Sequence, residues 1–330
     1  MKVISLFDGM SCGRIALERA GIEVKSYYAS EIDKHAVKVS RNNYPDIIQI
    51  GDVTKVNYKD GILYTENGEY FVGAIDLLIG GSPCQGFSMA GKQIAFNDER
   101  SKLYFEYERL LNEIQIDNPN VKFLLENVKM KQEYKDVISE RLGVQPVVIN
   151  SNLVSAQNRY RLYWTNISDI SVPKDRGILL KDILQNVVDD KYYIKNGRLQ
   201  WLKTFGELKE KKGYVAFSPN KAKCLTVRGE PSWNTTYILQ YPHGSNKGGL
   251  RAIDGKAPAM TVSSWEYNNL LLNDGLVRKL TPEECELLQT VPKGYTSKVS
   301  DSQRYKMLGN GWTVDVIAHI FEGLHKNINQ

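Results

Sequence analysis

Residues 74–88 read Ala-Ile-Asp-Leu-Leu-Ile-Gly-Gly-Ser-Pro-Cys-Gln-Gly-Phe-Ser. The apolar run before Gly80 has the composition of a short buried β-strand, and the glycines and the proline that follow it end the strand. Cys84 therefore begins a loop, and loops at strand ends carry much of the chemistry of α/β folds. A thiol in this position is suited to nucleophilic attack once it is partly ionised. A buried structural cysteine beside a turn is the competing interpretation.

The composition is that of an ordinary soluble globular protein. The 330 residues suffice for about two domains, and 42% of them are hydrophobic and 25% charged. No apolar run approaches the roughly 20 residues that a membrane helix needs, and residues 1–5 lead into a predicted strand rather than a signal peptide. We therefore expect a cytoplasmic protein without membrane contact. The four cysteines form no CxxC pair, so neither a disulfide framework nor a metal site is predicted.

Positive charge is concentrated in one part of the chain. The formal net charge is +5, and residues 166–277 contain 16 Lys and Arg against 11 Asp and Glu, while the remainder is balanced. Basic surface with interleaved aromatic residues is typical of nucleic-acid binding, although an excess of this size also fits a solvated face. Aromatic residues in this segment, such as Trp201 and Trp233, fit the core of a small domain as well as a binding surface.

Acidic residues follow three predicted strands near the N-terminus. They are Asp8 after the strand at residues 3–7, Glu31 after that at 24–30, and Asp52 after that at 47–50. A strand, a glycine turn and a helix form the first half of a nucleotide-binding βαβ unit, in which an acidic residue about 20 positions onward can bind ribose hydroxyls. The GxGxxG spacing is absent, which favours a nucleoside without phosphates. Each carboxylate taken singly also fits a helix cap.

Two features downstream extend the candidate site around Cys84. The polar, glycine-containing segment 85–100 is predicted to be a lid. The predicted strand at 121–125 ends in Glu126 and Asn127, which should lie near Cys84 if the two strands are neighbours. A carboxyl group placed there can act as a proton donor.

Arg159 and Arg161 alternate with aromatic residues at strand spacing, so both are expected on one face of a strand. They fit an exposed face, or fixed hydrogen-bond donors if that face lines a cleft. Near the C-terminus, Thr281 and Pro282 are expected as the N-cap and first residue of a helix. A last amphipathic helix is predicted over residues 313–325.

Several short motifs occur in a set order along the chain. They are Phe7-Asp8-Gly9, Glu31, Gly51-Asp52, Pro83-Cys84-Gln85, Glu126-Asn127-Val128, Gln157-x-Arg159-x-Arg161, the stretch from Arg278 to Gly294, and Gly309-Asn310. This series resembles that of the DNA (cytosine-5) methyltransferases over about residues 1–165 and 278–330. Two departures, Phe-Asp-Gly-Met-Ser-Cys-Gly and Gly-Gly-Ser-Pro-Cys, resemble the branch that contains the vertebrate de novo enzymes.

The resemblance implies an α/β fold, with a Rossmann-like class I methyltransferase sheet covered by helices on both faces and a small, mainly β target-recognition domain. It assigns residues 1–165 and 278–330 to the catalytic, cofactor-binding domain and residues 166–277 to target recognition. It implies a bacterial or phage-encoded DNA (cytosine-5-)-methyltransferase that uses S-adenosylmethionine and acts on double-stranded DNA. If the enzyme belongs to a restriction-modification system, the resemblance also implies a cognate restriction endonuclease as a partner.

By the same resemblance, Cys84 attacks carbon 6 of a cytosine flipped out of the duplex and Glu126 protonates N3. Arg161 and Arg159 bind the O2 side of the ring, and Asn127 orients the cluster. The cofactor-binding residues that it implies are Phe7, Asp8, Gly9, Glu31, Asp52, Pro83, Leu103, Asn310 and Trp312. No metal is implied.

Three other functions fit parts of these observations. A tRNA cytosine-5 methyltransferase would keep the fold and change the polymer, and methyl transfer to tRNA rather than to duplex DNA would identify it. A non-catalytic DNA-binding regulator would have no use for the intact set of Cys84, Glu126 and Arg161. A nicotinamide-dependent dehydrogenase would require the GxGxxG motif that the chain lacks.

Overall fold

The structure, a computed structural model, describes residues 1–82, 102–193, 237–240, 249–252, 256–260, 270–273 and 276–328. Several sequence predictions concern residues outside this part of the chain. They are the roles of Pro83 and Cys84, the lid at 85–100, and the placement of Trp201 and Trp233.

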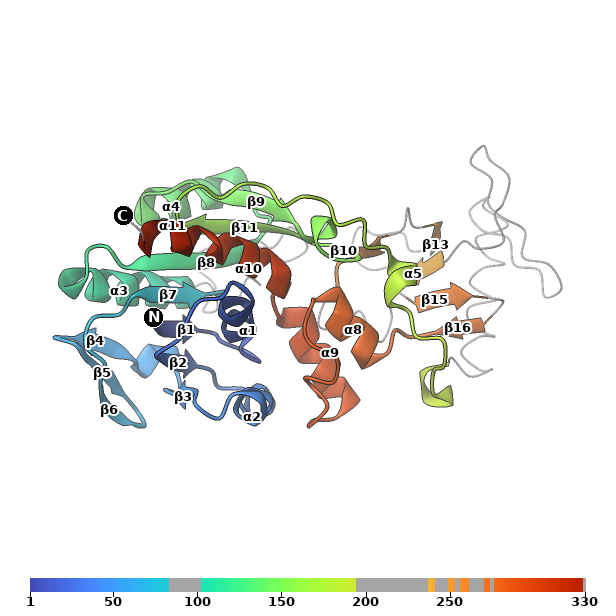
Figure 1. Cartoon of the computed structure of the whole chain (residues 1–330), viewed down its shortest axis with the longest axis horizontal. Helices are drawn as coiled ribbons and strands as arrows, with labels where there is room; N and C mark the ends of the chain where they lie inside the picture. Colours follow the sequence, from blue (N-terminus) through green and yellow to red (C-terminus); the bar gives the residue numbers. More distant parts are fainter. Residues whose placement is uncertain are drawn as a thin grey trace.

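A seven-stranded sheet forms the centre of the fold (Figure 1). Its strands are β3 (Ile48–Gln49), β2 (Ser26–Ser30), β1 (Lys2–Leu6), β7 (Leu77–Gly80), β8 (Lys122–Val128), β11 (Tyr160–Thr165) and β9 (Val147–Asn150), in that spatial order. The strands from β3 to β8 are parallel to one another, and β11 runs antiparallel to both of its neighbours.

Helices cover both faces of this sheet, which explains why its strands are apolar almost without interruption. Alternation along β1 sends Val3 into one core and Ile4 into the other. The core with Val3 also holds side chains of α1 (Cys12–Arg19), α2 (Lys34–Asn43) and α10 (Val314–Phe321). The core with Ile4 holds those of α3 (Lys102–Asp117) and α4 (Gln132–Leu142). The α/β class with helices on both faces is therefore confirmed.

Smaller elements surround the main sheet. β4 (Asn57–Lys59), β5 (Ile62–Thr65) and β6 (Gly68–Phe71) form an antiparallel sheet between β3 and β7 in the sequence, and β10 (Gln157–Asn158) pairs with β14 (Ala257–Pro258). At the opposite end of Figure 1 lies an antiparallel sheet of β13 (Gly249–Ala252), β12 (Tyr237–Gln240), β15 (Leu270–Asn273) and β16 (Leu276–Arg278). The other α-helices in the described residues are α5 (Leu180–Ile183), α8 (Pro282–Leu288), α9 (Asp301–Asn310) and α11 (Gly323–Ile328).

The limits of the target-recognition domain stay a prediction. The antiparallel sheet of β12 to β16 falls within or next to residues 166–277, as expected of a β-rich domain. However, Ile167 and Leu180 are buried in the same core as α1 and α10, so the start of this segment packs on the catalytic core.

The end of β8 and the C-terminal helix differ from the prediction. β8 continues to Val128, so Glu126 and Asn127 lie inside the strand and not after its end. The predicted C-terminal helix is divided into α10 and α11 at Glu322.

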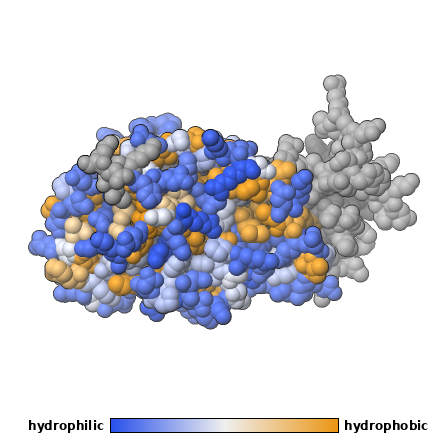
Figure 2. All heavy atoms as spheres, viewed as in Figure 1, coloured by the Kyte–Doolittle hydropathy of each residue, from blue (hydrophilic) through white to orange (hydrophobic). Residues whose placement is uncertain are grey.

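Within the described residues, no helix is both long and apolar enough to cross a bilayer. Figure 2 shows hydrophilic residues over most of the visible face, and exposed apolar side chains such as Phe71 are scattered.

Candidate active site

The order of the central sheet reverses between β1 and β7. From β1 the chain continues through β2 to β3 on one side, whereas β7 and β8 lie on the other side. In open α/β sheets, ligands bind at such a switch point, outside the carboxyl ends of the strands. The segments that follow these two strands, residues 7–11 and 81–82, therefore mark the candidate site.

The turn after β1 has an unusual backbone conformation. Phe7, Gly9 and Ser11 have φ values of 56°, 60° and 64°. This left-handed conformation costs a residue with a side chain about 1–2 kcal/mol, so Phe7 and Ser11 need compensating interactions. Asp8 N donates to Ser30 O at 3.0 Å, and Ser11 N donates to Asp8 O at 3.0 Å. The first bond attaches the turn to the end of β2, and the second closes the turn itself.

The side chain of Asp8 is directed into the protein and is only 9% exposed. Its carboxylate accepts hydrogen bonds from Ser11 Oγ at 2.5 Å and from Tyr27 Oη at 2.7 Å. Burial raises the pKa of Asp8 to about 6, although the bonds from Ser11 and Tyr27 oppose the rise. The resemblance assigned Asp8 to cofactor binding. In the structure, its carboxylate stabilises the first turn through buried hydrogen bonds.

Glu31 links the first turn to the segment after β2. Its Oε2 accepts from Gly9 N at 2.8 Å, and its Oε1 accepts from the main-chain nitrogens of Ile32 and Asp33 at 2.8 Å. A carboxylate has about four acceptor positions, so these three bonds leave room for one more donor. Glu31 can therefore bind a ligand hydroxyl while it holds the turn.

Asp52 follows β3 and is supported from the β5–β6 hairpin. Its Oδ1 accepts from Thr54 N at 3.0 Å and from Thr54 Oγ1 at 2.9 Å, and no hydrogen bond in the described part of the chain uses Oδ2. The main-chain nitrogen of Asp52 donates to Glu66 Oε1 at 3.1 Å, and Glu66 Oε2 accepts from Lys55 at 2.6 Å. The hairpin turn therefore fixes the loop that carries Asp52.

Gly81, directly after β7, is approached from two sides. A Cβ atom added to it would lie 2.8 Å from Trp312 Nε1 and 3.1 Å from Glu126 Oε2, so only glycine fits without displacement. Trp312 comes from the C-terminal part of the chain and Glu126 from β8. The switch point thus brings together one residue that the sequence assigned to the cofactor and one that it assigned to catalysis.

Glu126 and Arg161 form an ion pair on neighbouring strands. Glu126 Oε1 lies 2.8 Å from Arg161 Nε, and the side chains are 12% and 16% exposed. In the antiparallel register of β8 and β11, Arg161 lies opposite Val128, two residues from Glu126. Both side chains are therefore held by strands, which position them more rigidly than loops would.

Asn127 connects β8 to the segment that leads to Cys84. Its side chain is buried, with Nδ2 donating to Ser82 Oγ at 3.2 Å and Oδ1 accepting from Val128 N at 2.8 Å. Ser82 is the last described residue before Pro83 and Cys84. The amide of Asn127 thus fixes the start of that segment beside the ion pair.

Arg159 lies between β10 and β11, and its guanidinium binds main-chain carbonyls. Nη1 donates to Met260 O at 2.8 Å, and Nη2 donates to Gly309 O at 3.2 Å and Gly311 O at 3.1 Å. The residue is 4% exposed. The two arginines expected to share one role therefore have different surroundings, because Arg161 pairs with Glu126 while Arg159 binds two distant segments, at Met260 and at 309–311.

A buried ion pair begins the C-terminal part of the site. Arg278 contacts both oxygens of Glu284 at 2.7 Å, and Glu284 is fully buried. Glu284 also accepts from Thr281 N, while Thr281 Oγ1 accepts from Glu284 N, so the two form a capping box for α8. The N-cap at Thr281 and the first helical residue Pro282 are as predicted.

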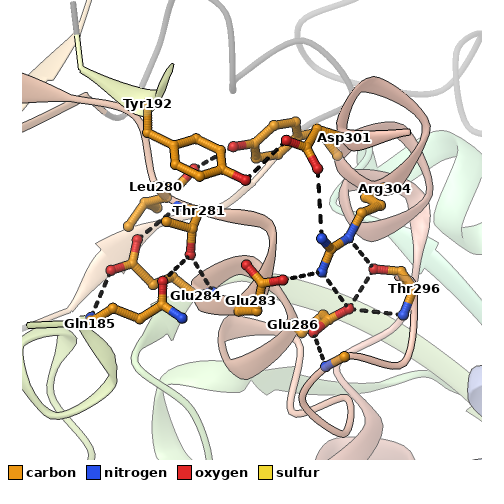
Figure 3. A network of polar contacts seen from close by, with 12 residues as sticks. Gln185, Tyr192, Leu280, Thr281, Glu283, Glu284, Glu286, Thr296, Asp301 and Arg304 are labelled. Carbon is orange, nitrogen blue, oxygen red and sulfur yellow. Dashed lines mark hydrogen bonds and ion pairs between the residues drawn. The ribbon is translucent and has the colours of Figure 1, made fainter. Parts of the chain in front are cut away.

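A second network fastens α9 to α8 (Figure 3). Arg304 Nη2 lies 2.7 Å from Glu283 Oε1 and 3.2 Å from Glu286 Oε1, and Arg304 Nε donates to Thr296 Oγ1 at 2.9 Å. Because α9 ends at Asn310, this network sets the position of the residues up to Trp312.

The other residues expected at the cofactor lie at the edges of this arrangement. Phe7 and Leu103 are half-buried against the core on the α3 side, whereas Trp312 packs against the opposite core. Asn310 is exposed at the last position of α9.

Two residues near the site were not anticipated from the sequence. In the sequence, Tyr27 was only one residue of the strand predicted at 24–30. The structure shows that its hydroxyl donates to Asp8. No sequence pattern indicated that Glu66 lies near the site, because its contact with Asp52 depends on how the β5–β6 hairpin folds.

Comparison with known proteins decides the class of this site. The family model for the C-5 cytosine-specific DNA methylases matches residues 1–326. The chain belongs to this family. The assignment confirms the resemblance in the motif order and the enzyme class, DNA (cytosine-5-)-methyltransferase. It also excludes the alternative function of a nicotinamide-dependent dehydrogenase.

Relatives within the C-5 cytosine methylase family align along almost the whole chain. The type II methyltransferase M1.ScrFI of Lactococcus lactis subsp. cremoris is 32% identical over 97% of this chain and 77% of its own length. The orphan methyltransferase M.SPRI of Bacillus phage SPR is 26% identical over 100% of this chain and 99% of its own length. A solved methyltransferase of Entamoeba histolytica shares the fold, with a TM-score of 0.68, 17% identity, and coverage of 100% and 99% of the two chains.

Proposed function

We propose that this enzyme transfers a methyl group from S-adenosylmethionine to carbon 5 of a cytosine in double-stranded DNA, through a covalent adduct of Cys84 with carbon 6. The observation that carries this proposal is the meeting of the Glu126–Arg161 ion pair with Gly81 and Trp312 at the switch point of the sheet. Cys84 follows Gly81 by three residues. The proposed acid, the proposed nucleophile and the cofactor residues thus belong to adjacent segments.

The residues present fit S-adenosylmethionine. Glu31 has an acceptor position left for a ribose hydroxyl, and Asp52 Oδ2 can accept from the amine of adenine. Close contact of Gly81 with the indole of Trp312 supports a pocket wall beside the first turn. When bound, the cofactor supplies an electrophilic methyl group.

The protein's own groups prepare the cytosine. Attack of the Cys84 thiolate forms a bond to carbon 6, and Glu126 donates a proton to N3, so that the electron pair pushed into the ring becomes available at carbon 5. Arg161 holds Glu126 and faces the O2 side of the ring. After methylation, a water molecule takes the proton from carbon 5, the bond to sulfur breaks so that Cys84 leaves as a thiolate, and N3 returns its proton to Glu126, which restores the aromatic ring.

The cytosine must leave the duplex before Cys84 can reach it, which costs a few kcal/mol of stacking and pairing. We assign the segment 85–100 to closure over the flipped base and residues 166–277 to recognition of the flanking sequence. The type II name of M1.ScrFI supports a cognate restriction endonuclease in a bacterial host, whereas the orphan name of M.SPRI supports a phage enzyme without one. Either setting is cytoplasmic.

Incubation with isotopically labelled S-adenosylmethionine tests the substrate. We expect label in duplex DNA and none in tRNA, and bisulfite sequencing of DNA from expressing cells should show protected cytosines in one sequence context. Label in tRNA alone would replace the proposal by its RNA-acting alternative. Absence of transfer to either polymer, with DNA still bound, would favour a non-catalytic regulator.

Glu66 should affect cofactor binding and not the chemical step. Replacement of Glu66 by alanine removes the acceptor for Asp52 N and frees the loop at Gly51. We expect the KM for S-adenosylmethionine to rise about threefold to fivefold with kcat unchanged, because a positioning bond is lost. Lys55→Ala is the matched control, since it removes only the exposed ion pair with Glu66. An equal effect of both substitutions would show that the ion pair, not the bond to Asp52, matters.

Arg159 should contribute mainly to stability. Replacement of Arg159 by alanine leaves three buried or part-buried carbonyls, those of Met260, Gly309 and Gly311, without this donor. We expect the free energy of unfolding in urea to fall by about 2–4 kcal/mol. Residual activity of the folded fraction should fall less than in Arg161→Ala. If Arg159→Ala instead lost all kcat with unchanged stability, the result would support the role expected from the sequence, in which Arg159 contacts cytosine directly.

A further inference from the structure

Tyr27 lies beneath the first turn, on the α1 side of the central sheet. It is 1% exposed, and its hydroxyl donates to Asp8 Oδ1 at 2.7 Å. A Cβ added to Gly13 would lie 2.9 Å from Tyr27 Oη and 2.4 Å from Ile79 Cδ1, so the phenol is tightly enclosed. Burial and the nearby Asp8 carboxylate raise the pKa of Tyr27 well above its usual value, which keeps the hydroxyl protonated as a donor.

A chain of hydrogen bonds reaches Asp8 from the other side. Ser11 Oγ donates to Asp8 Oδ2 at 2.5 Å and lies 2.6 Å from Ser40 Oγ in α2. Because a hydroxyl has one proton and Ser11 uses it on Asp8, Ser40 supplies the proton of the second bond. Gln49 Nε2 in β3 donates to Ser40 Oγ at 3.3 Å. Every donor is thus directed toward Asp8, which accepts on both oxygens as an ionised carboxylate does.

We propose that Tyr27 is a positioning residue for the cofactor site, which acts by holding the ionised Asp8 carboxylate and, through it, the strained turn at residues 7–11. The inference rests on the proposed use of S-adenosylmethionine at this turn. It assigns a role to a side chain that has no need to touch cofactor or cytosine. Asp8 accepts directly from Tyr27 in β2 and from Ser11 in the turn, and Ser11 links it to Ser40 in α2 and Gln49 in β3.

The pH dependence follows from the groups that face Asp8. Hydrogen bonds from Ser11, Ser5 and Tyr27 favour the ionised form of Asp8, whereas burial and the Glu31 carboxylate disfavour it. Burial raises the pKa of Cys12 to about 12, so this thiol stays neutral. With a pKa of about 6, Asp8 is ionised above this pH and loses an acceptor oxygen below it. Removal of the Tyr27 hydroxyl raises the pKa of Asp8 further, so cofactor binding should begin to weaken at a higher pH.

Calorimetric titration of the full chain with S-adenosylmethionine tests the proposal. We expect Tyr27→Phe to raise Kd about tenfold at pH 7.5, to leave kcat within about twofold at saturating cofactor, and to move the acidic limb of binding upward by about half a pH unit. Tyr28→Phe is the matched control, because Tyr28 is the next residue of β2, is also buried, and packs in the opposite core. It should bind like the wild type.

A double-mutant cycle with Asp8→Asn tests whether Tyr27 acts through Asp8. Tyr27→Phe combined with Asp8→Asn should bind no more weakly than Asp8→Asn alone. Ser40→Ala, which removes a donor two steps from Asp8, should raise Kd about threefold and serves if Tyr27→Phe fails to fold. The inference would be overturned if Tyr27→Phe bound S-adenosylmethionine with wild-type affinity, or if it lowered kcat at unchanged Kd. It would also be overturned if the double variant bound more weakly than Asp8→Asn by the factor that Tyr27→Phe shows alone. A wild-type enzyme that does not bind S-adenosylmethionine would instead overturn the proposed function on which it rests.

Discussion

Replacement of Cys84 by alanine should abolish methylation while leaving cofactor binding intact. Without the thiolate, no electron pair enters the cytosine ring and carbon 5 stays a poor nucleophile, so we expect kcat to fall by at least about 10³-fold. DNA containing 5-fluorocytosine should give a denaturation-resistant complex with the wild-type enzyme, because the fluorine at carbon 5 cannot leave as the proton does. The Cys84→Ala variant should give none.

Cys285→Ala is the control for the loss of a thiol. Cys285 is buried in α8, and burial together with the nearby Glu284 raises its pKa well above the usual value, so it is inert as a nucleophile. This variant should form the covalent complex and keep its kcat. Full methylation by Cys84→Ala would remove the nucleophile from the proposed mechanism.

Substitution of Glu126 by glutamine should have the next largest effect. The amide keeps the size of the side chain but cannot donate an acidic proton to N3, and it removes the charge that pairs with Arg161 at 2.8 Å. Loss of a positioned general acid costs about 10²–10⁴-fold in rate. We therefore expect kcat to fall by that factor in single-turnover methylation, with cofactor affinity unchanged within a few fold.

Glu108→Gln provides a matched comparison for this substitution. Glu108 on α3 pairs with Arg141 at 2.7 Å, and its side chain is 12% exposed, as that of Glu126 is. If loss of a paired carboxylate of this burial were sufficient, both variants would lose activity equally. We expect Glu108→Gln to keep its kcat, which would locate the effect of Glu126 in the chemical step.

Much of the sheet could be predicted because its strands are local patterns. The runs that became β1, β2 and β7 are bounded by glycine, proline or acidic residues, and each of these strands ends within one residue of its expected end. The end of β8 was misjudged because Glu126 and Asn127 are polar, and polarity usually marks the end of a strand. Here an ion pair and a hydrogen bond satisfy the two side chains inside the sheet.

The roles of side chains were less predictable than the strands, because they depend on partners far along the chain. Strand spacing placed Arg159 and Arg161 together, but it could not show that Met260 and Gly309 would present their carbonyls to Arg159. Likewise the motif order placed Asp8 at the cofactor, whereas only the register of β1 with β2 sets Tyr27 beneath it.

The closure of the first turn by the C-terminal part of the chain has a consequence for biosynthesis. Tyr295 donates to the carbonyl of Met10 at 2.8 Å across a separation of 285 residues, and Trp312 meets Gly81. At about 5–20 residues per second, a ribosome needs roughly 15–60 s to make the intervening chain. The contacts at Met10 and Gly81 therefore stay incomplete during most of translation, and we expect the nascent enzyme to become competent to modify DNA only when nearly the whole chain has been released.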